Sequence, residues 1–411
     1  MAVIRMWAPV RTRSFVQLWF AQALSLLGDG FSYVAFSWIT LTITRSSLAL
    51  GVVLAAQAVP RALLTLVGGA LSDRLSPRAL MLGSSCLRAA LMAGVAACGF
   101  LHLLSLAVLL AAAALFGAVD AFFQPARGSI LASVVAMEQL ESANALLTTG
   151  SRVAMVLGPA LGGIVVAASS ADVAFLIDGC CFVLVAAFVA RLPASGGQST
   201  DPAELEVGAA AAPSLRGQIL AGLSYTWADS RIRAIVLVDA AVTFCYAGPF
   251  TVGFASLARF RLDGSATALG LLNGALAAGA IVGALLGGTR RRRLPRVGLL
   301  IAALTAWLAI GMIALGLTTS VAASVVIVAL MGAGIGFQGV FGLSWIQRNI
   351  AADVLGRVIA FDMVAGYVLA PVSLVACGAL ARPEPMFVGT AVLLLLTTAG
   401  ILCSKQVVGM S

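Results

Sequence analysis

Charged side chains are scarce in this sequence. Only 10% of its 411 residues are Asp, Glu, Lys or Arg, whereas soluble domains carry about 25%. Hydrophobic residues make up 61% of the chain and occur in long runs. Such runs predict membrane-spanning helices rather than the alternating strands of an outer-membrane barrel, the only other structure that satisfies its backbone hydrogen bonds in lipid. We therefore expect an all-α polytopic membrane protein.

The sequence lacks the residue patterns that metal binding, disulfide bonding, ATP binding and catalysis need. His102 is the only histidine, and the seven cysteines show no CxxC or paired spacing. We therefore expect no metal site, no cofactor and no disulfide framework, and we interpret the cysteines as small apolar packing residues. The phosphate-binding pattern GxxxxGK[ST] does not occur, which argues against transport driven directly by ATP. Since no nucleophile–base pair is recognisable, we do not expect an enzyme.

Twelve apolar runs are long enough to cross a bilayer, and charges, prolines or short polar turns bound them. The basic start of the chain leads into a stretch too long for a signal peptide, so we interpret that stretch as the first span. The expected spans are 14–43, 48–72, 78–100, 104–125, 140–168, 172–192, 232–258, 266–288, 295–317, 320–344, 356–380 and 386–407.

The 25 basic residues are unevenly distributed among the connecting segments. If the N-terminus is cytoplasmic, 18 of them fall in cytoplasmic segments and only 4 in the opposite loops. The positive-inside rule then predicts that both termini are cytoplasmic. All but one of the basic residues are Arg, which together with abundant Ala and Gly indicates a bacterial source and hence a bacterial cytoplasmic membrane. We expect the run Arg290–Arg293 to contact anionic lipid rather than nucleic acid.

A polar segment divides the chain into two halves of six spans. Residues 193–231 begin with a stretch rich in Pro, Gly, Ser and acidic residues, which is typical of a flexible cytoplasmic linker. The halves are then 1–192 and 232–411. An apolar stripe in the linker fits either an interfacial helix or an extension of the seventh span, and its members are Leu215, Ile219, Leu223 and Trp227.

The two halves share glycine patterns at a constant offset of 219 residues. The tripeptide ALG occurs at 49–51 and again at 268–270, and Gly117 matches Gly336. Two parallel six-helix repeats, related by an axis along the membrane normal, are an architecture of transporters.

Five short motifs occur in a fixed order along the chain. They are GDG (28–30), GALSDRLSPR (69–78), FFQPARGSILASVVAMEQLESANALL (122–147), GPALGG (158–163) and VLGRVIAF (354–361). Together they resemble the major facilitator superfamily, and within it the branch of macrolide, siderophore and tetracycline-type efflux proteins. The resemblance covers essentially the whole chain. It implies twelve transmembrane helices in two pseudo-symmetric six-helix halves.

Two of these motifs imply roles in gating. The motif GALSDRLSPR resembles motif A of the superfamily. The resemblance implies that its Asp caps the N-terminus of the eleventh helix and ties the halves together; a helix N-terminus is a favourable place for a carboxylate. Its matching residues are Gly69, Asp73, Arg74 and Arg78, with Asp120 expected to join their charges. Ser76 and Pro77 depart from the family pattern, so one family Arg is missing. GPALGG resembles motif C, which implies either a seal between the halves or ordinary small-residue packing by Gly158, Pro159, Gly162 and Gly163.

Ionisable residues inside the spans are the first functional candidates, because a charge in the bilayer is costly. These candidates are Asp29, Arg61, Arg88 and Arg152. Two interpretations of Asp29 stay open: it binds a transported proton or a cationic substrate, or it is the permanent ion-pair partner of an Arg, most simply Arg61. The repeat offset places Gly248 and Ala280 at the positions of Asp29 and Arg61. The fourth span has no Arg, so the proton route that motif B provides elsewhere in the superfamily is absent.

The resemblance also implies that the first, fourth, seventh and tenth spans line a central cavity. Candidates for the cavity wall, including one from the second span, are Tyr33, Phe36, Gln57, Phe116, Phe244, Tyr246, Phe250, Gln338, Phe341 and Trp345. We expect roughly half of them to face lipid or to pack inside the protein.

These features predict a monomeric secondary transporter. We expect it to export drugs or amphipathic small metabolites, driven by protons, through alternating access of its two halves. One alternative is a flippase for lipids or other lipophiles on the same fold. Another is a membrane receptor or scaffold that transports nothing, although such a protein has little use for charges within its spans.

Overall fold

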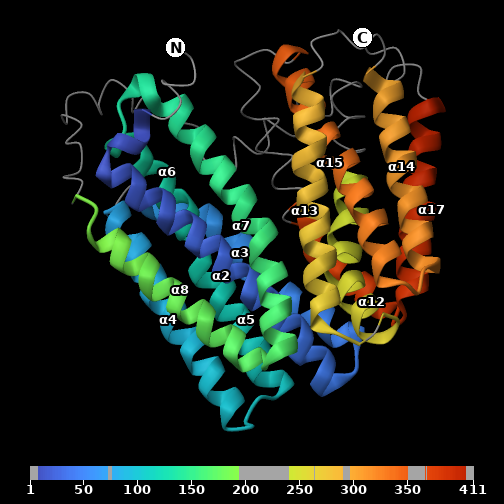
Figure 1. Cartoon of the computed structure of the whole chain (residues 1–411), viewed down its shortest axis with the longest axis horizontal. Helices are drawn as coiled ribbons and strands as arrows, with labels where there is room; N and C mark the ends of the chain where they lie inside the picture. Colours follow the sequence, from blue (N-terminus) through green and yellow to red (C-terminus); the bar gives the residue numbers. More distant parts are fainter. Residues whose placement is uncertain are drawn as a thin grey trace. The chain divides into compact units, whose positions relative to one another are not determined.

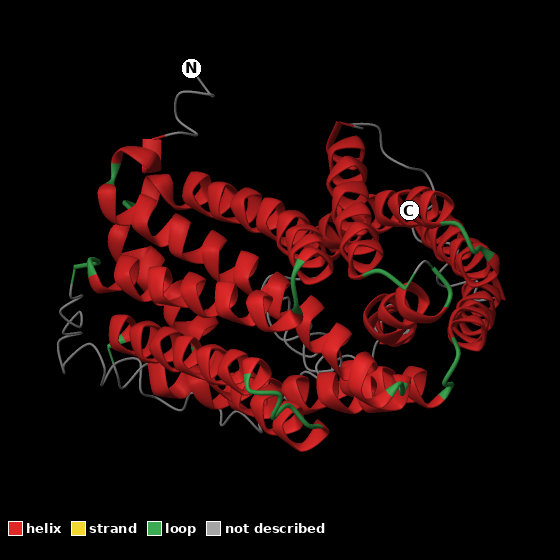
Figure 2. Ribbon diagram, turned by 60° about the horizontal axis from the view of Figure 1, so that its bottom comes forward, coloured by secondary structure: helices red, strands yellow, loops and turns green. Residues whose placement is uncertain are grey.

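The computed structural model describes residues 8–72, 76–193, 240–262, 264–289, 297–349, 366 and 368–403. Every secondary-structure element in this part of the chain is a helix (Figure 2). The longer helices are α2 (Arg13–Thr44), α3 (Ser47–Ser72), α4 (Pro77–Phe100), α5 (Leu106–Asp120), α6 (Phe123–Val134), α7 (Leu140–Ala168), α8 (Ala171–Ala190), α12 (Phe254–Phe260), α13 (Ala266–Thr289), α14 (Val297–Leu317), α15 (Val321–Asn349) and α17 (Pro383–Cys403). The predicted all-α class is confirmed.

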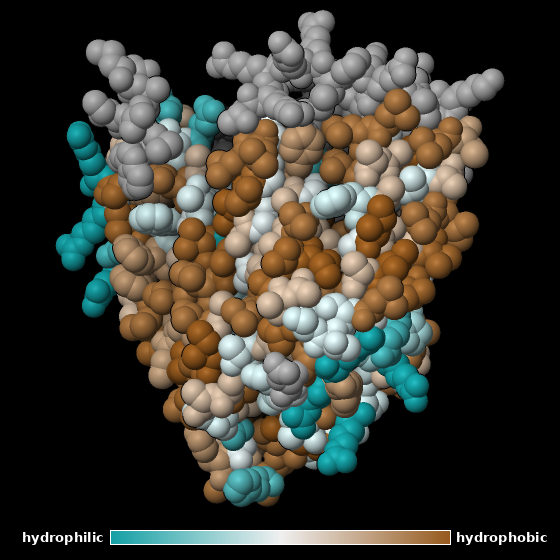
Figure 3. Space-filling view, turned by 45° about the vertical axis from the view of Figure 1, so that its right-hand side comes forward, coloured by the Kyte–Doolittle hydropathy of each residue, from teal (hydrophilic) through white to brown (hydrophobic). Residues whose placement is uncertain are grey.

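The described residues contain 11 helices that are long and apolar enough to span a membrane, and a shorter apolar helix at Val368–Ala379. That shorter helix lies where the eleventh span was expected, and most of the remainder of that span lies outside the described residues. Large apolar side chains on these helices are exposed, as expected for a surface that faces lipid. Figure 3 shows one face on which apolar side chains predominate and the most hydrophilic ones gather toward its margins.

Serine caps begin three of the helices in the first half of the chain. The hydroxyl oxygens of Ser76, Ser105 and Ser170 accept hydrogen bonds from backbone N–H groups three residues further on, at the starts of α4, α5 and α8. Each cap satisfies one of the N–H groups that have no partner within the helix. Pro77, at the first position of α4, fits because that position needs no N–H donor.

The fourth span is longer than the sequence predicted. The structure extends it from Leu106 to Leu131, with a short break between α5 and α6. Pro125 falls in the first turn of α6, where its missing N–H costs no hydrogen bond. The sequence analysis ended this span at residue 125, so it treated the rest of α6 as a loop and stated that the span has no Arg. The longer span contains Arg127.

Contacts divide the chain into two compact units. Unit 1 comprises Met1–Gln198 with Ala258–Gly274, and unit 2 comprises Ser199–Leu257 with Ala275–Ser411. In unit 1, α2 packs on α7 and α8, α4 packs on α8, and α3 packs on α5 (Figure 1). In unit 2, α14 packs on α17 and α15. The predicted halves, 1–192 and 232–411, with the linker 193–231 between them, stay a prediction.

The repeat predicted from glycine spacing corresponds to equivalent helix contacts inside the two units. In unit 1, a Cβ at Gly117 of α5 would lie 1.9 Å from the Gln57 carbonyl oxygen of α3. In unit 2, a Cβ at Gly336 of α15 would lie 1.9 Å from the Ala280 carbonyl oxygen of α13. Glycine thus lets the second and fourth spans, and the eighth and tenth, approach backbone to backbone.

Candidate functional site

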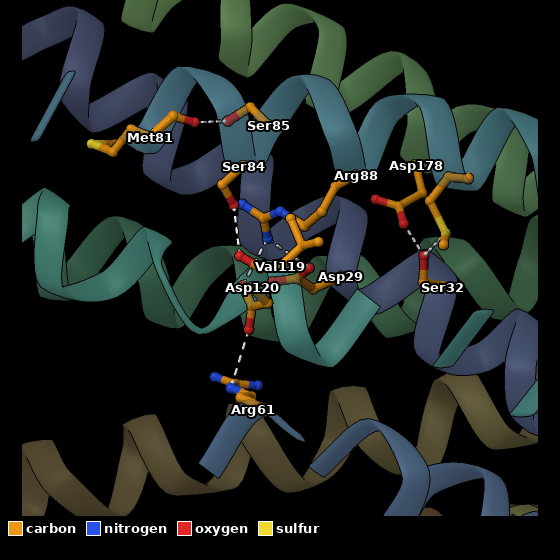
Figure 4. Close-up of polar contacts among 11 residues, drawn as sticks. Asp29, Ser32, Arg61, Met81, Ser84, Ser85, Arg88, Val119, Asp120 and Asp178 are labelled. Atoms are coloured by element: carbon orange, nitrogen blue, oxygen red, sulfur yellow. Dashed lines mark hydrogen bonds and ion pairs between the residues drawn. The ribbon is translucent and has the colours of Figure 1, made fainter. Parts of the chain in front are cut away.

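Four ionisable side chains from four helices of unit 1 lie together, and two of them are buried. We call this group the charge cluster: Asp29 (α2), Arg61 (α3), Arg88 (α4) and Asp120 (α5). Arg88 Nη1 lies 2.8 Å from Asp120 Oδ1 and 3.8 Å from Asp29 Oδ1. Arg61 Nε lies 3.1 Å from Asp120 Oδ2. Asp120 therefore bridges two arginines, and Arg88 bridges two carboxylates (Figure 4).

Arg88 lies at the centre of the charge cluster and is fully buried. Its side chain has 0% exposure, against 6% for Asp120, 31% for Asp29 and 47% for Arg61. The guanidinium carbon lies 4.1 Å from the ring centroid of Phe182, 4.8 Å from that of Phe123 and 5.9 Å from that of Phe116. These rings exclude water and attract the cation through their faces. Because Arg88 is shielded from water, removing one partner of its ion pairs is costly.

The structure brings together three of the four predicted intramembrane charges. Asp29, Arg61 and Arg88 belong to the charge cluster, whereas Arg152 is exposed on α7 and forms no ion pair with a carboxylate of the described residues. The simplest predicted pairing, Asp29 with Arg61, stays a prediction, and the structure shows two other pairings. Asp29 faces Arg88, and Arg61 binds Asp120.

The structure gives Asp120 partners that the sequence analysis did not name. That analysis put Asp120 at the cytoplasmic end of the fourth span, with the gating loop of motif A. Because the span continues through α6 to Leu131, Asp120 lies within it and pairs with Arg88. Its predicted link to the charges of motif A stays a prediction, because Asp73 and Arg74 lie outside the described residues.

Asp178 of α8 is a second buried carboxylate, and the sequence analysis missed it. Its exposure is 0%, and its Oδ2 accepts a hydrogen bond from the hydroxyl of Ser32 on α2 (Figure 4). Its Oδ1 has no hydrogen-bond partner among the described residues. The signal was available, because Asp178 interrupts the apolar run LIDGCC just as Asp29 interrupts the first span.

The two glycines that flank Asp29 have different neighbours. A Cβ at Gly28 would lie 2.3 Å from Asp178 Oδ1, so the bare backbone at Gly28 makes room for that carboxylate. A Cβ at Gly30 would lie 2.6 Å from the carbonyl carbon of Gly158 on α7. The GDG motif therefore joins α2 to α8 on one side and to motif C on the other.

Motif C packs α7 closely against two helices. Gly158 and Gly162 lie against the backbone of α2, and a Cβ at Gly162 would lie 3.1 Å from the Cα of Phe31. Gly163 lies against the start of α13, where a Cβ would approach the Ala266 carbonyl oxygen to 2.6 Å. Pro159 lies inside α7 between these contacts. Such backbone-to-backbone contacts are the small-residue packing that the sequence predicted; whether they also form a seal stays a prediction.

Motif A is described only in part. Gly69 lies in α3, and Asp73 and Arg74 lie outside the described residues. Arg78, in the first turn of α4, donates a hydrogen bond to the Ala190 carbonyl oxygen at the end of α8. The motif 354–361 and the basic run Arg290–Arg293 also lie outside the described residues.

The predicted cavity residues differ in their surroundings. Phe36 packs edge to face against Phe175, with ring centroids 4.8 Å apart. Phe116 is one of the three aromatic rings around the Arg88 guanidinium. Phe250 is buried beside Tyr246, at 4.5 Å between centroids. These three phenylalanines belong to the expected packed fraction. Four others are half-buried: Tyr33, Gln57, Phe244 and Gln338. Tyr246 is 36% exposed. The structure does not describe the side chains of Phe341 and Trp345 in α15.

An apolar pocket of about 280 Å³ lies between α2 and α7 of unit 1. Its lining residues are Trp19, Phe20, Ala23, Leu24, Leu27, Thr149, Gly150, Val153, Ala154 and Leu157. Trp19 donates its indole N–H to the Leu146 carbonyl oxygen, at 3.0 Å, which satisfies its polar atom. Gly150 makes room for the indole ring. The sequence analysis did not single out this pocket, because its walls are ordinary apolar residues of two spans.

Relatives of known function match most of the chain. The multidrug efflux pump Tap of Mycobacterium tuberculosis strain H37Rv is 29% identical over 371 residues, which cover 88% of this chain and 85% of the relative. The pump of the same name from Mycolicibacterium fortuitum is 26% identical, with 88% of each chain covered.

Solved transporter structures share the fold. A bacterial homologue of the human lysosomal transporter Spinster, in an inward-facing and occupied conformation, superposes with a TM-score of 0.72 at 16% identity, with 96% of each chain covered. The peptide transporter POT in complex with sulfate gives a TM-score of 0.72 at 14% identity, covering 95% of this chain and 94% of that chain. A family model described as "Transmembrane secretion effector" matches residues 4–399. The chain therefore belongs to the transmembrane secretion effector family of major facilitator transporters.

Proposed function

We propose that the protein is a proton-driven exporter of amphipathic drugs or metabolites, working by alternating access of its two halves. The observation that carries the proposal is the charge cluster, in which one buried arginine is shared by two carboxylates inside the membrane. Membership of a transporter family and the similarity to multidrug efflux pumps support the export of drugs.

The geometry supports Asp29 as the proton acceptor of this proposal. Its side chain is the more exposed of the two carboxylates that face Arg88, and its distance to Arg88 Nη1 is 3.8 Å, against 2.8 Å for Asp120. A proton on Asp29 removes the weaker of the two attractions to Arg88 and leaves the stronger one intact. Protonation then loosens α2 from α4 without leaving the buried arginine unpaired. A cationic substrate that approaches Asp29 would compete with the proton, as antiport requires.

The apolar pocket between α2 and α7 supports amphipathic substrates. It offers aromatic and aliphatic walls, and the one indole N–H in its lining is already bonded to the protein. A pocket without free polar groups binds by shape and apolar area, which tolerates chemically different ligands. Because the pocket and Asp29 lie on the same helix, occupation of one can influence the other.

The remaining predictions on partners and location belong to this proposal. The transporter works as a monomer in the bacterial cytoplasmic membrane, with both termini in the cytoplasm and anionic lipid at Arg290–Arg293. The asymmetric distribution of basic residues supports the orientation.

Transport by purified protein in liposomes tests the proposal. An imposed pH gradient should drive a cationic dye and a neutral drug against their concentration gradients. Asp29→Asn should abolish this accumulation for both compounds and preserve downhill exchange. Glu141→Gln, an exposed carboxylate in the first turn of α7, is the matched control and should behave as wild type.

Each arm of this experiment separates one alternative. If Asp29→Asn still concentrates both compounds, Asp29 does not couple transport to protons. If only the cationic dye is affected, Asp29 recognises the charge of the substrate instead. Movement of a fluorescent lipid between leaflets, with no movement of either compound, would identify a flippase.

A further inference from the structure

Asp178 is an ionisable group that the charge cluster does not use. It lies in the middle of α8, which packs against α2 and α4. Ser32 hydrogen-bonds to Oδ2, and Oδ1 lies in the space left by Gly28 with no hydrogen-bond partner among the described residues. No ion pair joins Asp178 to an arginine or lysine of the described part of the chain.

The charges around Asp178 make its ionised form unfavourable. Its Oδ1 lies against Gly28 of α2, the residue before Asp29, and Cys181 of its own helix lies beside the same glycine. Arg88 of α4 and Asp120 of α5 act on it through their charges. The ionisable residues of α7, Glu141 and Arg152, are exposed. The two arginines of the charge cluster are matched by its two carboxylates. An ionised Asp178 would therefore add an unpaired negative charge to a buried site, which is strongly disfavoured.

A neutral Asp178 fits the hydrogen bonds around it. Ser32 Oγ lies 3.4 Å from the sulfur of Met92 on α4 as well as within hydrogen-bond reach of Asp178 Oδ2. A proton on Oδ2 lets the carboxylic acid donate to Ser32, whose own hydroxyl then donates to the Met92 sulfur. Every donor in this chain of three groups then has an acceptor.

We propose that Asp178 is a second proton-binding carboxylate of the transport cycle, at the contact between α2 and α8. The proposal rests on the proton coupling proposed above. In the conformation described here, Asp178 holds a proton and Asp29 is ionised beside Arg88. When the protein changes conformation and water reaches α8, Asp178 releases that proton as substrate binds. The proton passes to water, and the carboxylate that remains is solvated.

Two measurements on the purified protein in lipid test this inference. Infrared spectroscopy should show the carbonyl stretch of a protonated carboxylic acid at neutral pH, absent in Asp178→Asn and shifted in frequency in Asp178→Glu. A pH-indicating dye should report protons released on addition of substrate. Asp178→Asn should lose most of this release, because Asp29 is already ionised in this conformation and the group that holds the proton is gone. Asp178→Glu should restore part of the release.

Asp172→Asn is the matched control, since Asp172 lies on the same helix, in its first turn. It should keep the infrared band and the full proton release. A merely structural role for Asp178 predicts that Asn, which still accepts the hydrogen bond from Ser32, releases as many protons as wild type; that result overturns the inference. If Asp178→Asn does not fold, a carbonyl band that stays unshifted in Asp178→Glu overturns it equally.

The outcomes also distinguish this inference from the proposed function. If wild type releases no protons with substrate and shows no transport driven by a pH gradient, the proton coupling itself is wrong. If wild type releases protons and the Asp178 variants match it, coupling stands and only the second site is rejected.

Discussion

Replacing Arg88 with methionine should destabilise the protein more than any other single change to the charge cluster. The substitution keeps most of the side-chain length but removes a fully buried cation held 2.8 Å from Asp120 and 3.8 Å from Asp29. Removing one partner of a buried ion pair costs about 3–5 kcal/mol, because the charge left behind stays buried without compensation. Asp120 keeps Arg61, but Asp29 loses the arginine that faces it. Because Asp29 is 31% exposed and Asp120 stays paired, we expect a loss at the lower end of this range.

The free energy of unfolding in mixed detergent micelles measures this loss. Arg152→Met is the matched control, since Arg152 also lies in a span of unit 1 but is exposed, and it should change stability by no more than about 0.5 kcal/mol. Adding Asp29→Asn to Arg88→Met should recover part of the loss, because the lone carboxylate is then gone. Equal effects of the two arginine substitutions would refute the interpretation of Arg88 as the centre of the site.

Three further substitutions have expected outcomes. Gly30→Leu should reduce folded yield on size-exclusion chromatography, because its Cβ would meet the backbone of α7 at 2.6 Å, while Gly94→Leu, with nothing within 4 Å, should not. Val153→Trp should fill the pocket between α2 and α7 and raise the KM for bulky apolar substrates more than for small ones, as measured by transport in liposomes. Phe182→Leu should cost about 0.5–2 kcal/mol of stability in mixed micelles, since the ring closest to the Arg88 guanidinium carbon is lost.

The sequence predicted the spans well because lipid imposes a length and an apolar composition on every crossing helix. The expected span 140–168 coincides with α7, Leu140–Ala168. It also singled out three members of the charge cluster, Asp29, Arg61 and Arg88, since a charge in an apolar run is conspicuous. What it could not predict was their pairing, which depends on how far each helix extends and how it is rotated. Asp120 shows this, because its partner became clear only when the fourth span was seen to continue through α6.

The two units use equivalent positions for different purposes. At the offset of 219 residues, Asp29 corresponds to Gly248, Arg61 to Ala280 and Arg88 to Trp307. In unit 2 the backbone N–H of Gly248 donates a hydrogen bond to the Ser373 hydroxyl at 2.8 Å. The Ala280 carbonyl oxygen packs against Gly336. The indole N–H of Trp307 donates a hydrogen bond to the Leu330 carbonyl oxygen at 3.2 Å.

These positions of unit 2 therefore join helices, where those of unit 1 carry charges. Within the described helices of unit 2, charged residues occur only near helix ends, at Arg348 and Glu384. The repeated helix arrangement thus carries the charge cluster in unit 1 and neutral helix contacts at the equivalent positions of unit 2. We therefore propose that protonation of the charge cluster acts on the helix contacts of unit 1.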